Sequence, residues 1–540
     1  MNFRAASLLV ALTGFIALSL ELVWTRLYYF LSATRAYAFA TMLAAYLLGL
    51  AIGSLWSIRV QRRCENSTPA EQSASVARLV LWANIAGWAL TPLVSWMAAT
   101  RTWGPFQNGI PPYVFTYPLV ALAAGWLGTL LPLICHFAVP PDAKVGSRLS
   151  KLYLANIVGA GAGSLLTGFV LMEYIPIRWI SWLLLFLGTA IYVVLSSCTR
   201  KALLRGVAVV GIGAAATPPL YWQFWERLQN EYTWGKGRDF TQIIESRSGV
   251  ITIDQEGHIY GGGAYDGVVD VSPVNTPWLV RAYALSAMCA NPEEVLVVGL
   301  SGGSWAQITA NNPAVKKVTC IEINHSYKEV IASHPIVSSL LQNPKVEIII
   351  DDGRRWLERN PDRKFDAILM NTTHHWREFA GNLLSKEYLT MAAAHLNPGG
   401  VFQYNATDSL RVHQTALEVF DHVNLLVNNV VIWNGPPVFD EKRWRPVLEN
   451  YTIDGKKVFD LANPRHRRVF DLFLALADTP SKEPGDLLSI NDSEGKPLWP
   501  SEKERQQFRL QTRVQMQHAC REGGASAITD DNLGHEYRWW

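Results

Sequence analysis

Residues 295–303 read VLVVGLSGG, and this stretch decides the fold of the C-terminal half. Its first part, VLVVGL, is a nearly continuous apolar run, which is typical of a parallel strand covered on both faces of a sheet. Its second part places Gly299, Ser301 and Gly303 in a G-x-S-x-G pattern. We therefore expect a buried strand that ends in a tight turn, where small residues let backbone N–H groups approach a polar or anionic ligand.

Strands and helices alternate along the chain after this stretch. Further strands are expected at 317–323, 346–350, 365–371, 400–405 and 430–433. Helices are expected at 305–312, near 326–341, and at 354–360, 385–396 and 413–423. This alternation predicts an α/β doubly wound sheet of the Rossmann type.

Acidic residues follow the next two predicted strands, where a doubly wound sheet binds its ligands. Glu322 lies near the end of the second strand, about 20 residues after the glycine turn, where a carboxylate accepts hydrogen bonds from both ribose hydroxyls. Asp351, Asp352 and Gly353 end the third strand, where an adenine edge would lie. The joint spacing predicts an adenosyl-nucleotide site with these binding residues: Gly299, Ser301, Gly303, Glu322, Asp352 and Gly353.

The N-terminal half is built of long apolar segments. A helix needs about 20 apolar residues to cross a bilayer. Seven stretches approach that length, at roughly 5–25, 37–58, 77–99, 114–139, 152–172, 176–197 and 203–222. The small residues of Gly159–Gly163 predict close helix packing. We expect a polytopic α-helical membrane domain with about seven hydrophobic segments, in contact with the lipid bilayer.

Basic residues in the loops predict the orientation of such a domain, because they collect on the cytoplasmic side. The N-terminus and every second loop hold Arg4, Arg59, Arg62, Arg63, Arg78, Lys144, Arg148, Lys151, Arg200, Lys201 and Arg205. The remaining loops hold Arg26, Arg35, Arg101 and Arg178. This count places the N-terminus in the cytoplasm, and seven crossings would then place the C-terminal half outside.

Adenosyl cofactors are found in the cytoplasm, so we expect the seventh segment to lie flat or to be re-entrant. The protein would then be a multi-pass protein of the cell (inner) membrane with its soluble domain in the cytoplasm. The predicted domains are a transmembrane domain at 1–222, a small β-rich subdomain at 223–290, a Rossmann-like domain at 291–440, and a C-terminal extension at 441–540 that forms a lid or a brace.

The composition excludes some classes of partner. A net charge of +3 over 540 residues gives no field that favours nucleic acid, so no nucleic-acid partner is expected. The six cysteines show no CxxC spacing, so the sequence predicts neither a disulfide framework nor a zinc site. We expect no bound metal.

The segment from Gln242 to about Trp433 resembles the spermidine synthases, which are polyamine aminopropyltransferases. The similar motifs, in order, are QIIES, GVITI, AYDGVVD, VLVVGLSGG, CIEIN, DDGRRWL, FDAILMN, NLLSKEYL and LNPGGVF. The N-terminal GFIALSLELVWTRL, the segment YLLGLAIGS and the C-terminal ITDDNLGHEY resemble fused major-facilitator-like/spermidine synthase proteins of the membrane.

The resemblance implies a class I S-adenosylmethionine-dependent transferase-like fold with a small N-terminal β subdomain. It implies that the six predicted binding residues hold S-adenosylmethionine or decarboxylated S-adenosylmethionine as the donor substrate. The implied reaction moves an aminopropyl group to an amine, as in polyamine biosynthesis. The resemblance also implies a possible homodimer.

The chain departs from the family pattern where the acceptor should bind. Spermidine synthases read Asp-Ser-Ser/Thr-Asp-Pro after the fourth strand, whereas this chain reads Asn-Thr-Thr-His-His at 371–375. Both carboxylates of that motif are therefore absent. Asp270 replaces a glutamine of the family, and Gly302 replaces the aspartate of the glycine loop.

These departures matter because an amine with a pKa near ~10.4 must lose a proton before it attacks. Asn371, at the position of the catalytic aspartate, cannot accept one. His374 or His375 could, and Asp266 and Asp270 could supply a carboxylate from the opposite wall. Either the base has moved or the substrate is not a polyamine. The candidate catalytic residues are Asn371, His374, Asp270 and Asp266.

Three functions remain open from the sequence. The first is a membrane-anchored transferase with an unidentified small-molecule acceptor, either an amine or a lipid-like molecule. The second is an S-adenosylmethionine-dependent methyltransferase. The third is a non-catalytic membrane protein that senses a nucleoside or transports a solute, because the catalytic aspartate of the family is Asn371. Arg377 either binds a carboxylate or phosphate or forms a surface ion pair with Glu378.

Overall fold

The computed structural model describes residues 2–100, 113–229, 239–371, 374–378, 380–407, 409–478, 510–511 and 513–532. Arg101, Thr372, Thr373 and the last residues of ITDDNLGHEY, which entered the sequence predictions, lie outside these ranges. The chain divides into two compact units. The first comprises 1–255 and 260–264, and the second comprises 256–259 and 265–540.

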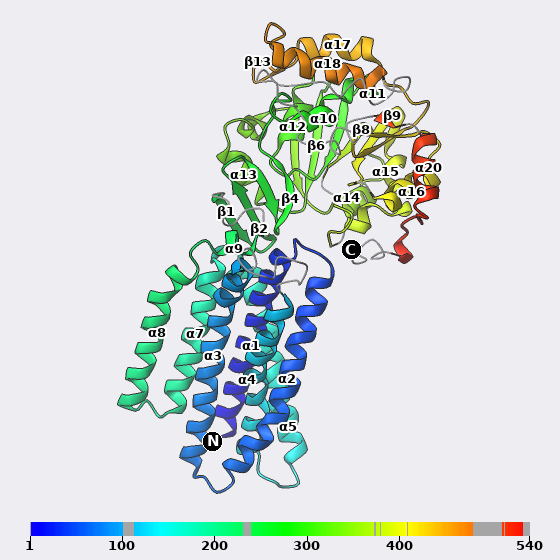
Figure 1. Ribbon diagram of the computed structural model, residues 1–540. Helices are drawn as coiled ribbons and strands as arrows, with labels where there is room; N and C mark the ends of the chain where they lie inside the picture. Colours follow the sequence, from blue (N-terminus) through cyan, green and yellow to red (C-terminus); the bar gives the residue numbers. More distant parts are fainter. Residues whose placement is uncertain are drawn as a thin grey trace. The chain divides into compact units, whose positions relative to one another are not determined.

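The first unit consists mainly of long apolar helices (Figure 1). They are α1 (Phe3–Leu31), α2 (Tyr37–Arg63), α3 (Pro69–Thr100), α4 (Tyr113–Ala138), α5 (Val145–Leu166), α7 (Ile177–Leu195) and α8 (Arg200–Leu220). A π-helical turn at Thr167–Leu171 and the short α6 (Met172–Tyr174) continue α5. Within the described residues, seven helices are long and apolar enough to cross a membrane. Each predicted segment therefore corresponds to one helix.

The predicted close packing of the glycine run occurs between α5 and α1. A Cβ atom on Gly159 would lie 1.9 Å from the carbonyl oxygen of Ala11, and one on Gly163 would lie 2.4 Å from that of Phe15. Gly161 has nothing within 4 Å of its Cβ position. Gly159 and Gly163 therefore lie against the α1 backbone, and a side chain at either position would push the two helices apart.

The seventh apolar segment forms one continuous helix, and its orientation in a membrane stays a prediction. Cβ atoms on Gly206 and Gly213 of α8 would lie 2.7 Å from Val193 and Leu185 of α7, respectively. This order of contacts shows that α8 runs antiparallel to α7. Trp182 Nε1 also donates a hydrogen bond to the Val210 carbonyl, at 3.2 Å. Small residues on α8 let it pack along a neighbour, as full-length spans do.

A β-hairpin is bound to the helix ends of the first unit. It consists of β1 (Phe240–Ser246) and β2 (Gly249–Asp254), which pair antiparallel. Glu245 accepts hydrogen bonds from the backbone N–H of Ile177, at 2.7 Å, and from Trp225 Nε1, at 3.1 Å. Arg26 donates to the carbonyl of Ser246, at 2.5 Å. With β3 (His258–Gly261) and β4 (Ala264–Val268), these strands form a four-stranded sheet. The boundary between the compact units falls inside the predicted β-rich segment, and the four-part division of the sequence remains a prediction.

The second unit contains an eight-stranded sheet in the order β14-β10-β11-β9-β8-β5-β6-β7. Its strands are β5 (Glu294–Val298), β6 (Lys317–Glu322), β7 (Val346–Ile350), β8 (Phe365–Met370), β9 (Leu396–Asn405), β10 (Val423–Leu426), β11 (Asn429–Trp433) and β14 (Leu510–Gln511). The strands from β7 to β9 pair in parallel, whereas β11, β10 and β14 add antiparallel pairs beyond β9. The predicted doubly wound fold is confirmed, with a mixed sheet.

Both faces of this sheet are buried, as the apolar run of β5 predicts. Val295 and Val297 belong to one hydrophobic core, and Leu296 and Val298 belong to another on the opposite face. The first core includes residues of α10 (Val280–Tyr283), α11 (Leu285–Met288) and α12 (Ser304–Ala310). The second includes residues of α14 (Gly353–Arg359), α15 (Lys386–Ala394) and α16 (Leu410–Val419).

The C-terminal segment packs on this unit as part of its core. Trp444 of α17 (Glu441–Glu449) donates to the Tyr283 carbonyl at 2.8 Å, and α18 (Pro464–Asp478) adds Phe470 and Phe473 to the same core. Near the end of the chain, α20 (Arg513–Glu522) packs against α16. Asp530 then binds Arg354 of α14 in a bidentate ion pair with distances of 2.9 and 2.6 Å. The described part of the extension therefore braces the α/β unit.

Candidate functional site

The glycine turn after β5 has the tight geometry that its sequence predicts. Gly299, Ser301 and Gly303 have φ values of +85°, +48° and +80°. Glycine adopts this region without strain, whereas Ser301 does so at a cost. Ser301 Oγ donates to the carbonyl of Asp266 at 2.8 Å, which ties the turn to the end of β4. The turn is therefore held in a fixed shape.

Glu322 lies at the end of β6 and supports the same turn. Its Oε2 accepts a hydrogen bond from the Leu300 backbone N–H at 2.6 Å, and its Oε1 accepts one from the Asn324 N–H at 2.8 Å. The side chain is buried, and burial raises the pKa of Glu322 above the usual carboxyl range. The Ser301 backbone N–H is a third donor to this carboxylate, so three of its four acceptor positions face the backbone.

Asp352 and Gly353 begin α14 directly after β7. Asp352 Oδ1 caps this helix by accepting from the Arg355 N–H at 2.8 Å, and no other described residue contacts Oδ2. A Cβ atom on Gly353 would lie 2.7 Å from Val298 Cγ1, so the helix start lies close to β5. Because β5, β6 and β7 are adjacent parallel strands, the sheet brings all six predicted binding residues to one edge.

A cavity of about 330 Å³ lies beside the glycine turn. Five residues predicted for the site line it: Gly299, Ser301, Asp266, Asn371 and His374. The other predicted residues, Gly303, Glu322, Asp352, Gly353 and Asp270, are not part of its wall. Two of the predicted nucleoside residues, Gly299 and Ser301, therefore share this cavity with three of the predicted catalytic residues.

Asp266 carries the carboxylate of the cavity wall, and this group is already paired. Arg377 Nη1 lies 2.6 Å from Asp266 Oδ1, and the Tyr327 hydroxyl donates a hydrogen bond to Oδ2. The Asp266 side chain is only 7% exposed. Arg377 thus pairs with a residue more than 100 positions away along the chain. The ion pair neutralises the charge of this carboxylate inside the site.

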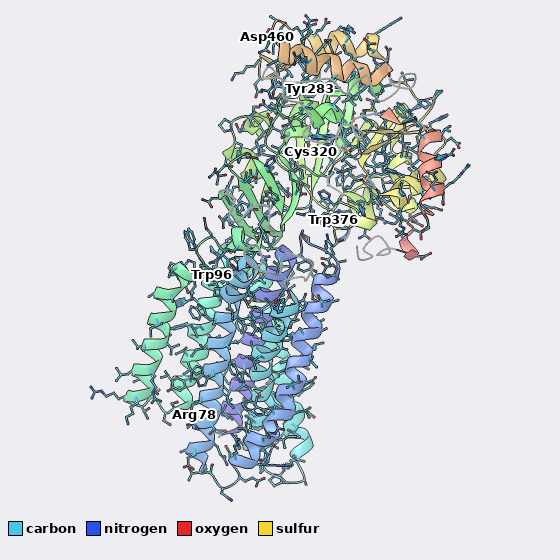
Figure 2. The ribbon with its side chains drawn as sticks, viewed as in Figure 1. Arg78, Trp96, Tyr283, Cys320, Trp376 and Asp460 are labelled. Atoms are coloured by element: carbon cyan, nitrogen blue, oxygen red, sulfur yellow. The ribbon has the colours of Figure 1, made fainter. Side chains whose placement is uncertain are left out.

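His374 is the group on the cavity wall that can take up a proton. Its Nε2 lies 2.7 Å from the carbonyl oxygen of Tyr265, so the neutral ring carries its proton on Nε2. Its Nδ1 is buried and has no hydrogen-bond partner among the described residues. Burial lowers the pKa of His374, which keeps the ring neutral near pH 7. The ring of Trp376, labelled in Figure 2, stacks on His374 with centroids 4.9 Å apart.

The two other catalytic candidates cannot act as that base in this arrangement. Asn371 lines the cavity with a buried Oδ1 that lacks a partner among the described residues, and an amide does not take up a proton. Asp270 lies outside the wall and stabilises a turn instead. Its oxygens accept from the Ser272 N–H at 2.8 Å and from the Thr276 hydroxyl at 2.9 Å.

Sequence reasoning missed Arg281, which also lines the cavity. It lies on the short α10, in a segment without a recognisable motif. Its Nη1 donates to the side-chain oxygens of Asn428, at 2.6 Å, and Asn429, at 3.2 Å. The turn between β10 and β11 supplies both asparagines, and β10 itself was not predicted. The Asn428–Asn429 pair is typical of a turn, but it gives no indication that Arg281 binds there.

Comparisons with known proteins match part of this site to a protein family. Residues 282–431 match the spermine/spermidine synthase domain. The polyamine aminopropyltransferase 2 of Hyperthermus butylicus is 29% identical over 207 residues, which cover 36% of this chain and 65% of that protein. The Bacillus subtilis polyamine aminopropyltransferase is 26% identical over 190 residues, covering 34% of this chain and 64% of the relative. The chain thus spans less than two thirds of the length of these relatives.

Among solved structures, spermidine synthase from Thermotoga maritima aligns with 40% of this chain and 80% of its own, with 16% identity and a TM-score of 0.34. The matched residues 282–431 run from α10 to β11 and include the glycine turn, Glu322, Asp352 and Asn371. The C-terminal part of this chain therefore contains a spermine/spermidine synthase domain.

Proposed function

We propose that this protein is a transferase that takes decarboxylated S-adenosylmethionine as donor and moves its aminopropyl group to an acceptor amine. The observation that carries the proposal is the domain match over residues 282–431, which contains the glycine turn and Glu322 at one edge of the sheet. The matched relatives are named polyamine aminopropyltransferases. A further spermidine synthase structure is described as a complex with the transition-state analogue AdoDATO.

The residues at the sheet edge fit the nucleoside of such a donor. We assign the remaining acceptor position of Glu322 to the ribose and Asp352 Oδ2 to an amino group on the adenine edge. Gly353 starts a helix that lies against β5. The proposal assigns these three residues to donor binding.

His374 is the residue we propose as general base. In the transfer, the nitrogen lone pair of the acceptor attacks the carbon bonded to the sulfonium. The carbon–sulfur bond breaks, and its electron pair neutralises the sulfur to give methylthioadenosine. Before this attack the acceptor ammonium must lose a proton, and we assign the uptake of that proton to His374, which lines the cavity and whose Nδ1 has no hydrogen-bond partner among the described residues. The paired Asp266 cannot do so without losing its ion pair with Arg377.

The proposal includes anchoring in a membrane by the seven apolar helices. It also includes a cytoplasmic location for the α/β unit, because the donor is made there. Seven crossings, with the N-terminus in the cytoplasm as the loop charges predict, would instead place the α/β unit outside the cytoplasm. A reporter that is active only in the cytoplasm, fused to the C-terminus, separates them. Activity supports the proposed location, and inactivity of a well-expressed fusion contradicts it. The possible homodimer remains a prediction.

The experiment that tests the proposed function uses the full chain purified in detergent. Calorimetry measures the binding of S-adenosylmethionine, its decarboxylated form and methylthioadenosine, and chromatography follows the release of methylthioadenosine in the presence of candidate amines. We expect binding of the nucleosides and release that depends on both donor and amine. If none of the three compounds binds, the domain does not use an adenosyl donor and the proposal is wrong.

A further inference from the structure

The charges on the cavity wall are the opposite of those that a polyamine requires. A polyamine carries several positive charges and needs carboxylates that are not already neutralised. The wall contains the carboxylate of Asp266, which pairs with Arg377, and the guanidinium of Arg281. No carboxylate among the described residues contacts Arg281. The cavity therefore contains an uncompensated cation and no uncompensated anion.

Arg281 is held in a defined position by neutral groups. Its Nε donates to the Trp278 carbonyl at 2.9 Å, and its Nη1 donates to Asn428 and Asn429. The guanidinium carbon lies 5.4 Å from the ring centroid of Trp305, a distance suited to a cation–π contact. Burial lowers the pKa of Arg281 to about 10, so the group remains charged at neutral pH.

Donor groups remain available at this end of the cavity. The N–H groups on Nη2 of Arg281 have no partner among the described residues. The side-chain oxygen of Asn428 faces Arg281, and therefore its Nδ2 amide hydrogens point elsewhere, with no partner among the described residues. A guanidinium with free N–H groups beside an amide N–H is a typical recognition site for a carboxylate.

We propose that Arg281 and Asn428 bind a carboxylate of a substrate in this cavity. At least one of the two substrates, donor or acceptor, would then carry a carboxylate. This inference rests on the proposed function, because it takes the cavity as the place where donor and acceptor meet. Either of the two substrates could supply this carboxylate. It belongs either to an acceptor of the amino-acid type or to a donor that keeps its carboxylate, and the second source would replace the decarboxylated donor of the proposed function.

The experiment compares matched pairs of compounds that differ only in this group. For the donor, calorimetry compares S-adenosylmethionine with its decarboxylated form. For the acceptor, kinetics compare 4-aminobutanoate with 1,4-diaminobutane. We expect wild-type protein to favour the carboxylate in one pair by at least about tenfold, as the loss of a charge-assisted hydrogen bond implies. A preference in the first pair identifies the donor as the source, and a preference in the second identifies the acceptor.

Two variants show whether Arg281 causes the preference. Arg281→Gln removes the charge and should abolish it. Asn428→Asp keeps the shape of the side chain but places a carboxylate next to Arg281 and neutralises its charge. The protein should then prefer the compound that lacks the carboxylate. Arg521→Gln, on the exposed surface of α20, is the matched control and should keep the wild-type preference.

Methylthioadenosine separates the failure of this inference from the failure of the proposed function, since it carries neither carboxylate nor acceptor. If wild-type protein does not bind methylthioadenosine, the proposed function is wrong. Normal binding of methylthioadenosine together with no carboxylate preference, or a preference that survives in both variants, overturns the role of Arg281 alone. If Arg281→Gln no longer binds methylthioadenosine, its fold is damaged. The preference measured in Asn428→Asp then decides whether Arg281 binds the carboxylate.

Discussion

The two sides of the glycine turn differ in how far they keep the chemistry expected of the family. On the nucleoside side, Glu322 and Asp352 are present, and backbone N–H groups fix both side chains. On the cavity side, Asn371 replaces the expected carboxylate, Asp266 is paired, and Arg281 adds a positive charge. Under the proposed function, the residues assigned to the donor follow the family pattern, whereas the residues around the acceptor depart from it. The following predictions test this difference.

The largest effect is expected on the cavity side, from His374→Gln. The glutamine side chain keeps a donor for the Tyr265 carbonyl but cannot take up a proton. We expect the rate of transfer to fall by roughly 100- to 10,000-fold, while the dissociation constant of methylthioadenosine stays unchanged. In wild-type protein the rate should rise with pH as the imidazole loses its proton. Because burial lowers the pKa of His374, this rise should lie below the usual histidine pKa of 6.5.

Steady-state kinetics over a range of pH measure both quantities. An unchanged rate in His374→Gln would show that another group takes the proton, and His375 would be the next residue to substitute. Arg521→Gln serves again as the surface control.

On the nucleoside side, Glu322→Ala should weaken methylthioadenosine binding by about 100-fold or more, since it removes the proposed ribose acceptor and leaves the Leu300 and Asn324 N–H groups without their partner. Glu322→Gln keeps the shape and a single acceptor oxygen, so it should lose less affinity. Calorimetry on the full chain measures both. Wild-type affinity in Glu322→Ala would show that the nucleoside does not bind at this edge.

Asp266→Asn tests whether the paired carboxylate has a structural role. The variant leaves the Arg377 guanidinium without its ionic partner in a largely buried position, which should lower the free energy of unfolding by about 3 kcal/mol. The double variant Asp266→Asn/Arg377→Gln should recover part of this loss, because it removes the stranded charge. Thermal unfolding in detergent measures the difference. A large loss of rate with no loss of stability would instead show that Asp266 acts on the substrate.

The smallest effect concerns the pH dependence of stability. Burial, with a contribution from His375, lowers the pKa of His413 to about 4. An unfolded histidine takes up a proton near pH 6.5, and the folded state resists it, so stability is lost as the pH falls below 6.5. The expected loss between pH 7 and pH 5 is about 2 kcal/mol. Unfolding of His413→Gln at both values should show a weaker pH dependence, and an equal dependence would assign the effect to other groups.

The sequence predicted the framework of the α/β unit well because its signals are local. VLVVGL, KVTCIEI, VEIII and FDAILMN are mostly apolar runs, and each one contains a strand of the sheet. Strand β10 was missed because its four residues, VNLL, begin only a few residues after α16 and are too few to show a period. The predicted helix at 413–423 in fact ends at Val419.

Local sequence signals predicted the nucleoside residues of the site but not the charge pattern of the cavity. The nucleoside residues follow strands in sequence and therefore lie at one sheet edge, as the motif spacing indicates. The charge pattern of the cavity depends on contacts between distant segments: Asp266 with Arg377, and Arg281 with Asn428. No spacing rule predicts such pairs. The tautomer of His374 likewise depends on a backbone carbonyl 109 positions away.

The ion pair between Arg354 and Asp530 has a consequence for the order in which the protein is made. Arg354 follows Gly353 on the helix that begins the nucleoside side, and Asp530 lies near the end of the chain. During synthesis the apolar helices emerge first, hundreds of residues before Asp530. A nascent chain can thus insert its helices while this end of the sheet still lacks its last contact. The proposed donor site would be completed only after Asp530 has been made, hundreds of residues after the apolar helices.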